Sequence, residues 1–402
     1  MSENSFLEKL QQFKIPDWYI PANNIVSKSE FRELLIKASK HEKVKIHELK
    51  SKINAKLWDK YKSKFDKQFS NATYIPALDY TMFMFEIILP ILEPVFKAFD
   101  LELNLDKQNK TLIVTTPYFA RKPVKENIKL VLRHQPNQKT QKSRNKIYYQ
   151  WNLYYHAYSQ KNSIANFSID FNTLIIAPKP EIPVDLIKPW FMRDIDIFTH
   201  ELIHLIFELV NWKTPLFIRQ QFSGHPNKMF TLLVIFDVFN EALAYTYEYL
   251  ALLIIAQEFL TEPELAEFII LDQVWVLVHK TLFLLDERVG RDKKLKNTQK
   301  LLQNPLETVK SSTKLYEVYK TGVFYTLFDE REILASPWGG TALSYYLMIH
   351  KQNKDWWYFD KNGNFDLQLA INQLKKHILD LRNNPNYLEQ FENIVKLVYG
   401  VL

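Results

Sequence analysis

Apolar residues recur at helical intervals in the first part of the chain, separated by many charged residues. Between positions 28 and 69 the apolar residues at this spacing include Phe31, Leu34, Leu35, Ile46, Leu49 and Leu57. The pattern predicts a helix over residues 28–69, which Ser27 or Ser29 could cap at its start. Because so many charges lie between the apolar positions, we expect a solvated arm or cap rather than a part of the core.

The next segment, residues 79–99, is apolar enough to suggest a membrane span. Glu86, Pro90, Glu93 and Pro94 interrupt it, however. Charged residues are costly inside a bilayer, and proline breaks helices. The pattern therefore favours two buried helical pieces, and we expect no membrane span here.

A change of pattern marks residues 111–178, where β-branched and aromatic residues partly alternate with polar ones. This pattern predicts a small sheet of about four strands, with one strand each in 111–118, 128–134, 147–159 and 165–178. A basic stretch from His134 to Lys146 separates two of them. We interpret it as a solvated loop and expect no nucleic-acid partner, since it contains no recognisable binding motif.

From residue 185 onward the periodicity is almost entirely helical. The helical segments are 191–212, 227–259, 263–286, 298–330, 341–352 and 366–398. The fold class is therefore α+β and predominantly α, with one small sheet and a large helical C-terminal body. We divide the chain into an N-terminal helical arm (1–70), a core (71–290) and a C-terminal helical region (291–402).

The composition of the chain excludes several kinds of site. The chain has 402 residues, a net charge of +7, seven glycines and no cysteine. Without cysteine it can form no disulfide, no thiolate metal site and no cysteine nucleophile. The first 25 residues lack a basic start followed by an apolar run, so we expect no conventional signal peptide. We therefore expect a cytoplasmic protein, or one exported without a classical leader.

The strongest chemical signal is the run His200-Glu201-Leu202-Ile203-His204, which has the pattern His-Glu-x-x-His. Residues four apart on a helix are rotated by only about 40°, so both histidines project from one face and could bind one metal ion. Glu201 is offset around the helix and can stand beside a metal-bound water. This arrangement suits zinc-activated water with a glutamate as general base.

A zinc site of this kind needs a third protein ligand. Glu241 is the best candidate because it lies in a strongly apolar helical segment, 37 residues after His204, where a carboxylate is costly unless it meets a cation. Rival ligands are His225, Asp237, Glu248 and Glu208. Asp237, Asn240 or Glu208 could instead orient the histidines through their second ring nitrogen.

The pairing of His-Glu-x-x-His with the later segment Asn240-Glu241-Ala242-Leu243-Ala244 resembles the gluzincin class of zinc metallopeptidases. The resemblance implies one Zn²⁺ held by His200, His204 and Glu241, with Glu201 as the general base. It also implies a zincin-like fold, in which a small mixed sheet packs on the active-site helix and the C-terminal region completes the cleft. Thermolysin-like members have an aspartate four residues after the ligand glutamate, where this chain has Tyr245.

A later segment, Gly339 to Tyr346, is similar to part of the oligopeptidase-like gluzincins. The similarity makes Tyr345 and Tyr346 candidates for stabilising the oxyanion, with His350 as a further possibility. In zincins an edge strand beside the active-site helix pairs with an extended peptide, and residues 165–177 or 147–159 could supply that edge.

Together these features predict a zinc-dependent metalloprotease, a hydrolase whose substrate is a peptide or protein. Two alternatives stay open: a zincin-fold protein that binds without hydrolysing, and a membrane-associated protease. The apolar segments at 79–99, 229–260 and 266–285 prompt the second alternative.

Overall fold

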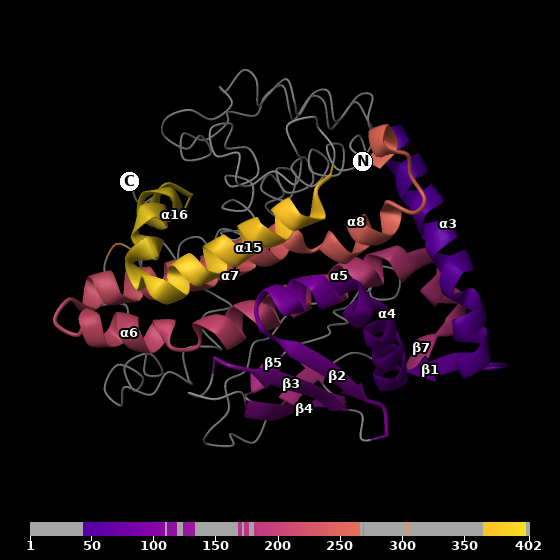
Figure 1. Ribbon diagram of the computed structural model, residues 1–402, viewed down its shortest axis with the longest axis horizontal. Coiled ribbons are helices and arrows are strands. Elements are labelled where there is room, and N and C mark those ends of the chain that lie inside the picture. Colours follow the sequence, from indigo (N-terminus) through magenta and orange to yellow (C-terminus); the bar gives the residue numbers. More distant parts are fainter. Residues whose placement is uncertain are drawn as a thin grey trace.

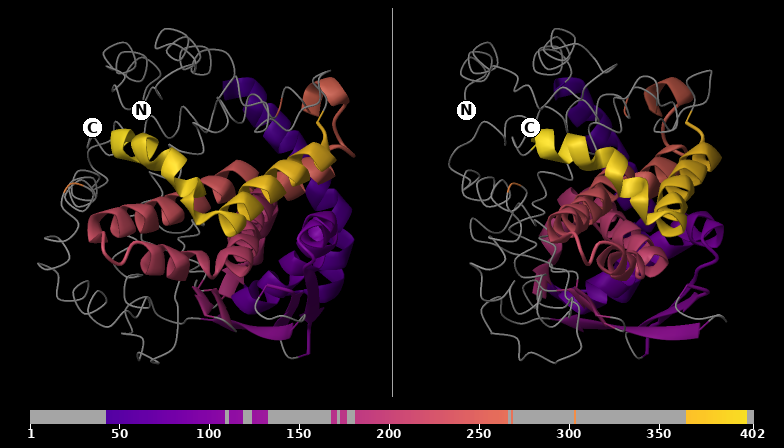
Figure 2. Two further views of the ribbon diagram at one scale, coloured as in Figure 1. Left: turned by 60° about the vertical axis from the view of Figure 1, so that its left-hand side comes forward. Right: turned by 90° about the vertical axis from the view of Figure 1, so that its left-hand side faces the viewer.

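The fold is α+β and mainly helical. The computed structural model describes residues 43–108, 111–118, 124–132, 168–170, 173–176, 181–265 and 365–398, together with the single positions 268 and 303. Figures 1 and 2 show that the described helices lie on one face of a five-stranded sheet. The predicted fold class, α+β and predominantly α, is confirmed, but the described strands form two small sheets rather than one.

The five-stranded sheet is mixed, as predicted. In spatial order its strands are β2 (Glu102–Asp106), β3 (Thr111–Thr116), β4 (Val124–Leu132), β6 (Thr173–Ile176) and β5 (Ser168–Asp170). Neighbouring strands are antiparallel except β4 and β6, which run parallel. Segment 111–118 contains β3, and 128–134 overlaps the end of β4. Segment 165–178 was predicted as one strand but contains two, β5 and β6, which pair antiparallel. The fourth segment, 147–159, lies outside the described residues. The additional strand β2 was not predicted.

A second, two-stranded sheet fixes where two long helices begin. Strands β1 (Tyr74–Pro76) and β7 (Glu181–Pro183) pair antiparallel, with Ile75 opposite Ile182. Helix α4 (Ala77–Ala98) follows β1 directly, and helix α5 (Val184–Asn211) follows β7 directly. Because the strands pair, the two helices start side by side, although about 100 residues separate them in the chain.

Helix α4 corrects one prediction, because it is a single helix with Pro90 and Pro94 inside it rather than two pieces. A proline removes one backbone N–H and frees one carbonyl of the preceding turn. Both prolines lie on the exposed side, together with Glu93. Water can satisfy the freed carbonyls there, while the opposite side of the helix stays buried in the core.

Helix α3 (Lys43–Gln68) corrects another prediction, because one of its sides is buried rather than solvated. Its Ile53 and Leu57 are fully buried. Asn54 bridges a gap in the hydrogen bonding of α5 near Pro189: its amide donates to the carbonyl of Lys188, and its oxygen accepts from the N–H of Met192. Helix α3 is therefore a support for the first turns of α5.

The helices after α5 surround it. In chain order they are α6 (Thr214–Gln221), α7 (Pro226–Tyr247), α8 (Leu250–Ala256), α15 (Leu367–Asn383), the 3₁₀ helix η6 (Pro385–Phe391) and α16 (Glu392–Val398). Helices α7, α8 and α15 all contact α5. Arg382 of α15 donates to the carbonyl of Val210 at 2.5 Å and lies over the ring of Tyr118. Arg382 thereby ties α15 to the C-terminal end of α5.

The stretch Pro226–Ala256, which spans α7 and α8, is the one described segment long and apolar enough to cross a membrane. Its most apolar window is 89% buried within the protein. A buried helix in a protein core has the same composition, so this stretch is weak evidence for a membrane span.

Candidate metal centre

Two adjacent helices supply the predicted site. Helix α5 carries His200, Glu201 and His204 near its middle, and α7, which packs against it, carries Glu241. All four side chains are buried, and His204 is completely inaccessible to solvent. The prediction that the two histidines project from one face of a helix is confirmed, because their imidazole rings contact each other.

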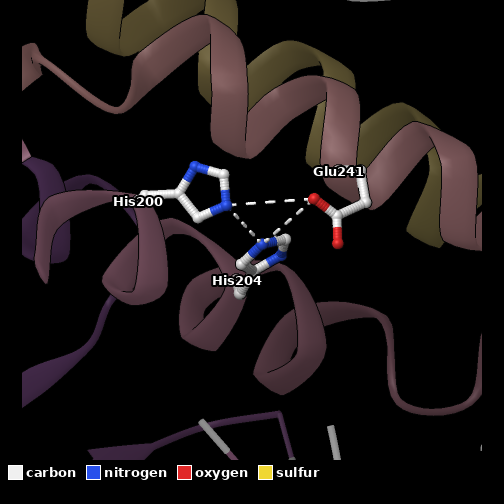
Figure 3. A group of neighbouring side chains, drawn as sticks. All are labelled: His200, His204 and Glu241. Carbon is white, nitrogen blue, oxygen red and sulfur yellow. Dashed lines mark hydrogen bonds and ion pairs between the residues drawn. The ribbon is translucent and has the colours of Figure 1, made fainter. Parts of the chain in front are cut away.

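The three predicted ligands converge at one point. Figure 3 shows the His200, His204 and Glu241 side chains pointing toward one another from the two helices. The Nε2 atoms of the histidines are 3.1 Å apart, and Glu241 Oε2 lies 3.9 Å from Nε2 of His200 and 3.8 Å from Nε2 of His204. Tetrahedral zinc, with bonds of about 2.0–2.1 Å, holds its ligand atoms about 3.3–3.4 Å apart. The three atoms match that geometry to within about half an ångström, so this group could hold a metal ion.

The other nitrogen of His204 is engaged by Asn240, which fixes the tautomer. Glu208 Oε1 accepts from the Asn240 amide nitrogen at 3.0 Å, so the amide oxygen must face the ring. That oxygen lies 2.8 Å from Nδ1 of His204 and can only accept a hydrogen bond. Nδ1 therefore carries the proton, and the lone pair of Nε2 points at Glu241 and His200. Of Asp237, Asn240 and Glu208, the residues predicted to contact the second nitrogen of a histidine, Asn240 is hydrogen-bonded to His204, and Glu208 is hydrogen-bonded to Asn240.

The other histidine also has an acceptor near its Nδ1, but as a close ion-pair contact rather than a hydrogen bond. Nδ1 of His200 lies 3.3 Å from Oε2 of Glu248, a carboxylate oxygen that can only accept while the group is ionised. The sequence analysis treated Glu248 as a rival metal ligand. In the structure it lies on the Nδ1 side of His200 and is not part of the converging group.

The three converging atoms form a site that suits a cation electrostatically. The Nε2 lone pair of His204 faces Nε2 of His200 and a carboxylate oxygen of Glu241. When the proton of His200 is on Nδ1, these three atoms repel one another unless a positive charge lies between them. A proton is a poor solution, because burial and the neighbouring His200 hold the pKa of His204 well below its ordinary value. A metal ion bound by all three atoms removes the conflict.

The balance of buried charge in the described part of the protein also favours a cation. The buried acidic side chains of the described residues are Asp194, Asp196, Glu201, Asp237, Glu241 and Glu248. No lysine or arginine is buried within the described ranges. Burial, followed by the negative charge of Glu241, raises the pKa of Glu201 well above its ordinary value. Oε2 of Glu201 has no hydrogen-bond partner among the described residues. The donor set and this orphaned carboxylate oxygen both fit a bound cation.

The remaining rivals for the third ligand are outside the converging group. His225 is exposed at the start of α7, about 24 Å along the helix from Glu241. Asp237 is buried one turn before Glu241, and Glu208 contacts Asn240 instead.

The later candidates cannot be placed. Tyr345, Tyr346 and His350 lie outside the described residues, so their proposed part in stabilising the oxyanion stays a prediction.

Tyr245 lies at the site, although the sequence marks it only as a departure from the thermolysin-like pattern, which has an aspartate at this position. Its ring packs against that of His200, with centroids 4.8 Å apart and the planes tilted by 66°. Burial, and then the charges of Glu241 and Glu248, raise the pKa of its phenol well above the ordinary value. Its position one turn after Glu241 was the available signal, since residues four apart share a helix face.

Comparison of the chain with known proteins finds no matching family model, no matching curated protein and no matching solved structure.

Proposed function

We propose that this protein is a zinc metallopeptidase of the gluzincin type. One observation carries the proposal: the Nε2 atoms of His200 and His204 and a carboxylate oxygen of Glu241 converge, while both Nδ1 atoms face acceptors. A second observation supports it. Glu201, next to the first ligand on the same helix, is buried with an oxygen that has no hydrogen-bond partner among the described residues.

Zinc is the ion that this donor set favours. Two imidazole nitrogens and one carboxylate oxygen are the ligands of many catalytic zinc sites, where the fourth position stays open for water or substrate. A hard ion such as Mg²⁺ or Ca²⁺ prefers a shell of oxygen atoms. Zinc, when bound, acts as a Lewis acid on water and on the oxygen of the scissile carbonyl.

Glu201 handles the proton in the proposed reaction. Its Oε2 takes a proton from water as the water oxygen bonds to the peptide carbonyl carbon. The same oxygen then gives the proton to the peptide nitrogen as the carbon–nitrogen bond breaks, which releases an amine and a carboxylic acid. Burial and Glu241 raise the pKa of Glu201, and a cation held by the three proposed ligands would favour the ionised form that a general base needs.

The sheet offers a means of binding an extended peptide. Among the described strands, β5 (Ser168–Asp170) is at an edge of the five-stranded sheet and runs antiparallel to its neighbour β6. It lies within residues 165–177, one of the two segments predicted to pair with the substrate. An edge strand presents free backbone groups, to which a peptide can add as a further strand. In this proposal the fold is zincin-like and the substrate is a peptide or protein.

A cleavage assay tests the proposal. The full-length protein is loaded with zinc and incubated with a peptide library derived from cell lysate, and newly formed termini are identified by mass spectrometry. We expect cleavage by the wild type, loss of cleavage with a chelator, and recovery when zinc is restored. Glu201→Gln should keep its zinc and lose at least 100-fold in rate, because general acid–base catalysis contributes about 10²–10⁴-fold.

The matched control is Glu262→Gln, which changes an exposed glutamate after α8. It should cleave like the wild type. A Glu201→Gln variant as active as the wild type would refute the mechanism. A zinc-loaded wild type that cleaves nothing across diverse peptides would instead favour the alternative of a zincin-fold binding protein.

A further inference from the structure

The two histidines of the site are held by chemically different partners. His204 faces a neutral amide, Oδ1 of Asn240, whereas His200 faces a carboxylate, Oε2 of Glu248. Glu248 follows the last residue of α7 and keeps helical backbone angles, with φ −55° and ψ −32°. It is buried, with only 8% of its surface exposed. A carboxylate that is this buried needs a positive or proton-bearing neighbour, and Nδ1 of His200 lies within ion-pair distance of it, at 3.3 Å.

Helix geometry explains why Glu248 reaches this position. It lies seven residues after Glu241, which is close to two helical turns, so both carboxylates project from nearly the same face. The step along the helix is about 10 Å, so the two carboxylates meet His200 at different nitrogens. Glu241 is near Nε2 and Glu248 is near Nδ1. Between them Tyr245 packs edge-on against the same ring.

We propose that Glu248 is the positioning residue for His200, an inference that rests on the proposed zinc site. It keeps the Nδ1 proton in place, which leaves Nε2 as the metal ligand. The negative charge of Glu248 also makes Nε2 of His200 a stronger electron-pair donor to the metal than a neutral amide partner would. Tyr245 restrains the ring plane from the side. His200 is thus the more strongly electron-donating of the two histidines.

The test measures zinc affinity in the full-length protein with two variants of the residue. Glu248→Ala removes the acceptor, and Glu248→Gln keeps an acceptor oxygen but removes the charge. Glu262→Gln, an exposed glutamate in the same part of the chain, is the control. Affinity is measured by competition with a chromophoric chelator. The imidazole tautomer is read in the metal-free protein by ¹⁵N NMR of labelled histidine.

We expect Glu248→Ala to bind zinc about 10–100-fold more weakly, the range typical for loss of a partner behind a metal ligand. Glu248→Gln should lose less, and the control should match the wild type. In the metal-free wild type, His200 should carry its proton on Nδ1. Glu248→Ala should shift that population toward Nε2. A purely structural role would lower the melting temperature but leave zinc affinity and tautomer unchanged.

Three results would overturn the inference. One is wild-type affinity, within twofold, in a folded Glu248→Ala or, where that variant does not fold, in Glu248→Gln. Another is complete loss of zinc from both Glu248 variants while Glu241→Ala keeps it, which would make Glu248 a direct ligand. The third is a wild-type protein that binds no zinc, and this one also refutes the proposed function. The first two leave the proposed function standing.

Discussion

Oδ1 of Asn240 lies 2.8 Å from Nδ1 of His204, and this contact decides which ring nitrogen faces the rest of the site. The amide cannot turn over without losing its hydrogen bond to the carboxylate of Glu208. A chain of three side chains therefore fixes the tautomer of a completely buried imidazole. The Nε2 lone pair of His204 therefore points to the side where His200 and Glu241 converge.

We predict that Asn240→Ala weakens zinc binding about 10–100-fold without abolishing it. The three proposed ligands remain, but the His204 ring loses the acceptor that orders it. Isothermal titration with zinc, or competition with a chelator, measures the change. The control is Asn104→Ala, which removes an exposed asparagine of β2. Equal zinc affinity in Asn240→Ala and the wild type would show that the amide does not orient a metal ligand.

We predict that Glu201→Gln stabilises the metal-free protein at neutral pH. Burial and the charge of Glu241 raise the pKa of Glu201, so an ionised carboxylate is unfavourable in the folded state. An amide of the same shape removes this cost. The melting temperature with chelator present should rise by a few degrees, and the gain should shrink with zinc, because a cation stabilises the carboxylate. A lower melting temperature for Glu201→Gln would contradict this account.

We predict a pH-dependent loss of stability from Asp194, a residue of α5 away from the ligands. Burial raises its pKa to about 7, although the Tyr80 hydroxyl donates to its Oδ2 at 2.5 Å. A carboxyl with a raised pKa in the folded state favours folding at low pH, and this contribution disappears as the pH rises through about 7. Between pH 5 and pH 8 the loss is about 3 kcal/mol.

Urea unfolding at pH 5 and pH 8 measures this effect. Asp194→Asn should lack most of the pH dependence that the wild type shows. Asp185→Asn, which changes an exposed aspartate of the same helix, should retain it. The same pH dependence in Asp194→Asn as in the wild type would show that another group is responsible.

The candidate metal ligands could be predicted because each leaves a local signal. His200 and His204 are one turn apart on one helix, so no knowledge of the tertiary fold is needed to bring them together. Glu241 stands out as a carboxylate in an apolar helix, where only a polar partner offsets the free-energy cost of burying it. The structure brings these three together, as the sequence analysis expected.

The partners of the histidines could not be predicted individually. Whether Asp237 or Asn240 of α7 contacts His204 depends on how far α7 is shifted along α5, and periodicity within one helix carries no information about that shift. The same uncertainty placed Glu248 among the rival ligands. Only the relative position of the two helices shows that it faces Nδ1 rather than Nε2.

The errors in the fold have similar causes. Two prolines were expected to divide α4, but they lie on its exposed side, and which side is exposed depends on the packing of the helix. Strand β2 has an apolar residue at every second position, Leu103 and Leu105, but it is only five residues long. So short an alternation is a weak signal beside the longer apolar segments that flank it.

The most direct test of the central claim is the zinc content of the purified full-length protein after equilibrium dialysis against micromolar zinc. We expect one ion per chain in the wild type and in His225→Ala, which removes the exposed histidine at the start of α7. We expect none in His204→Ala. A wild type without zinc under these conditions, or a His204→Ala variant that binds a full equivalent, would contradict the account.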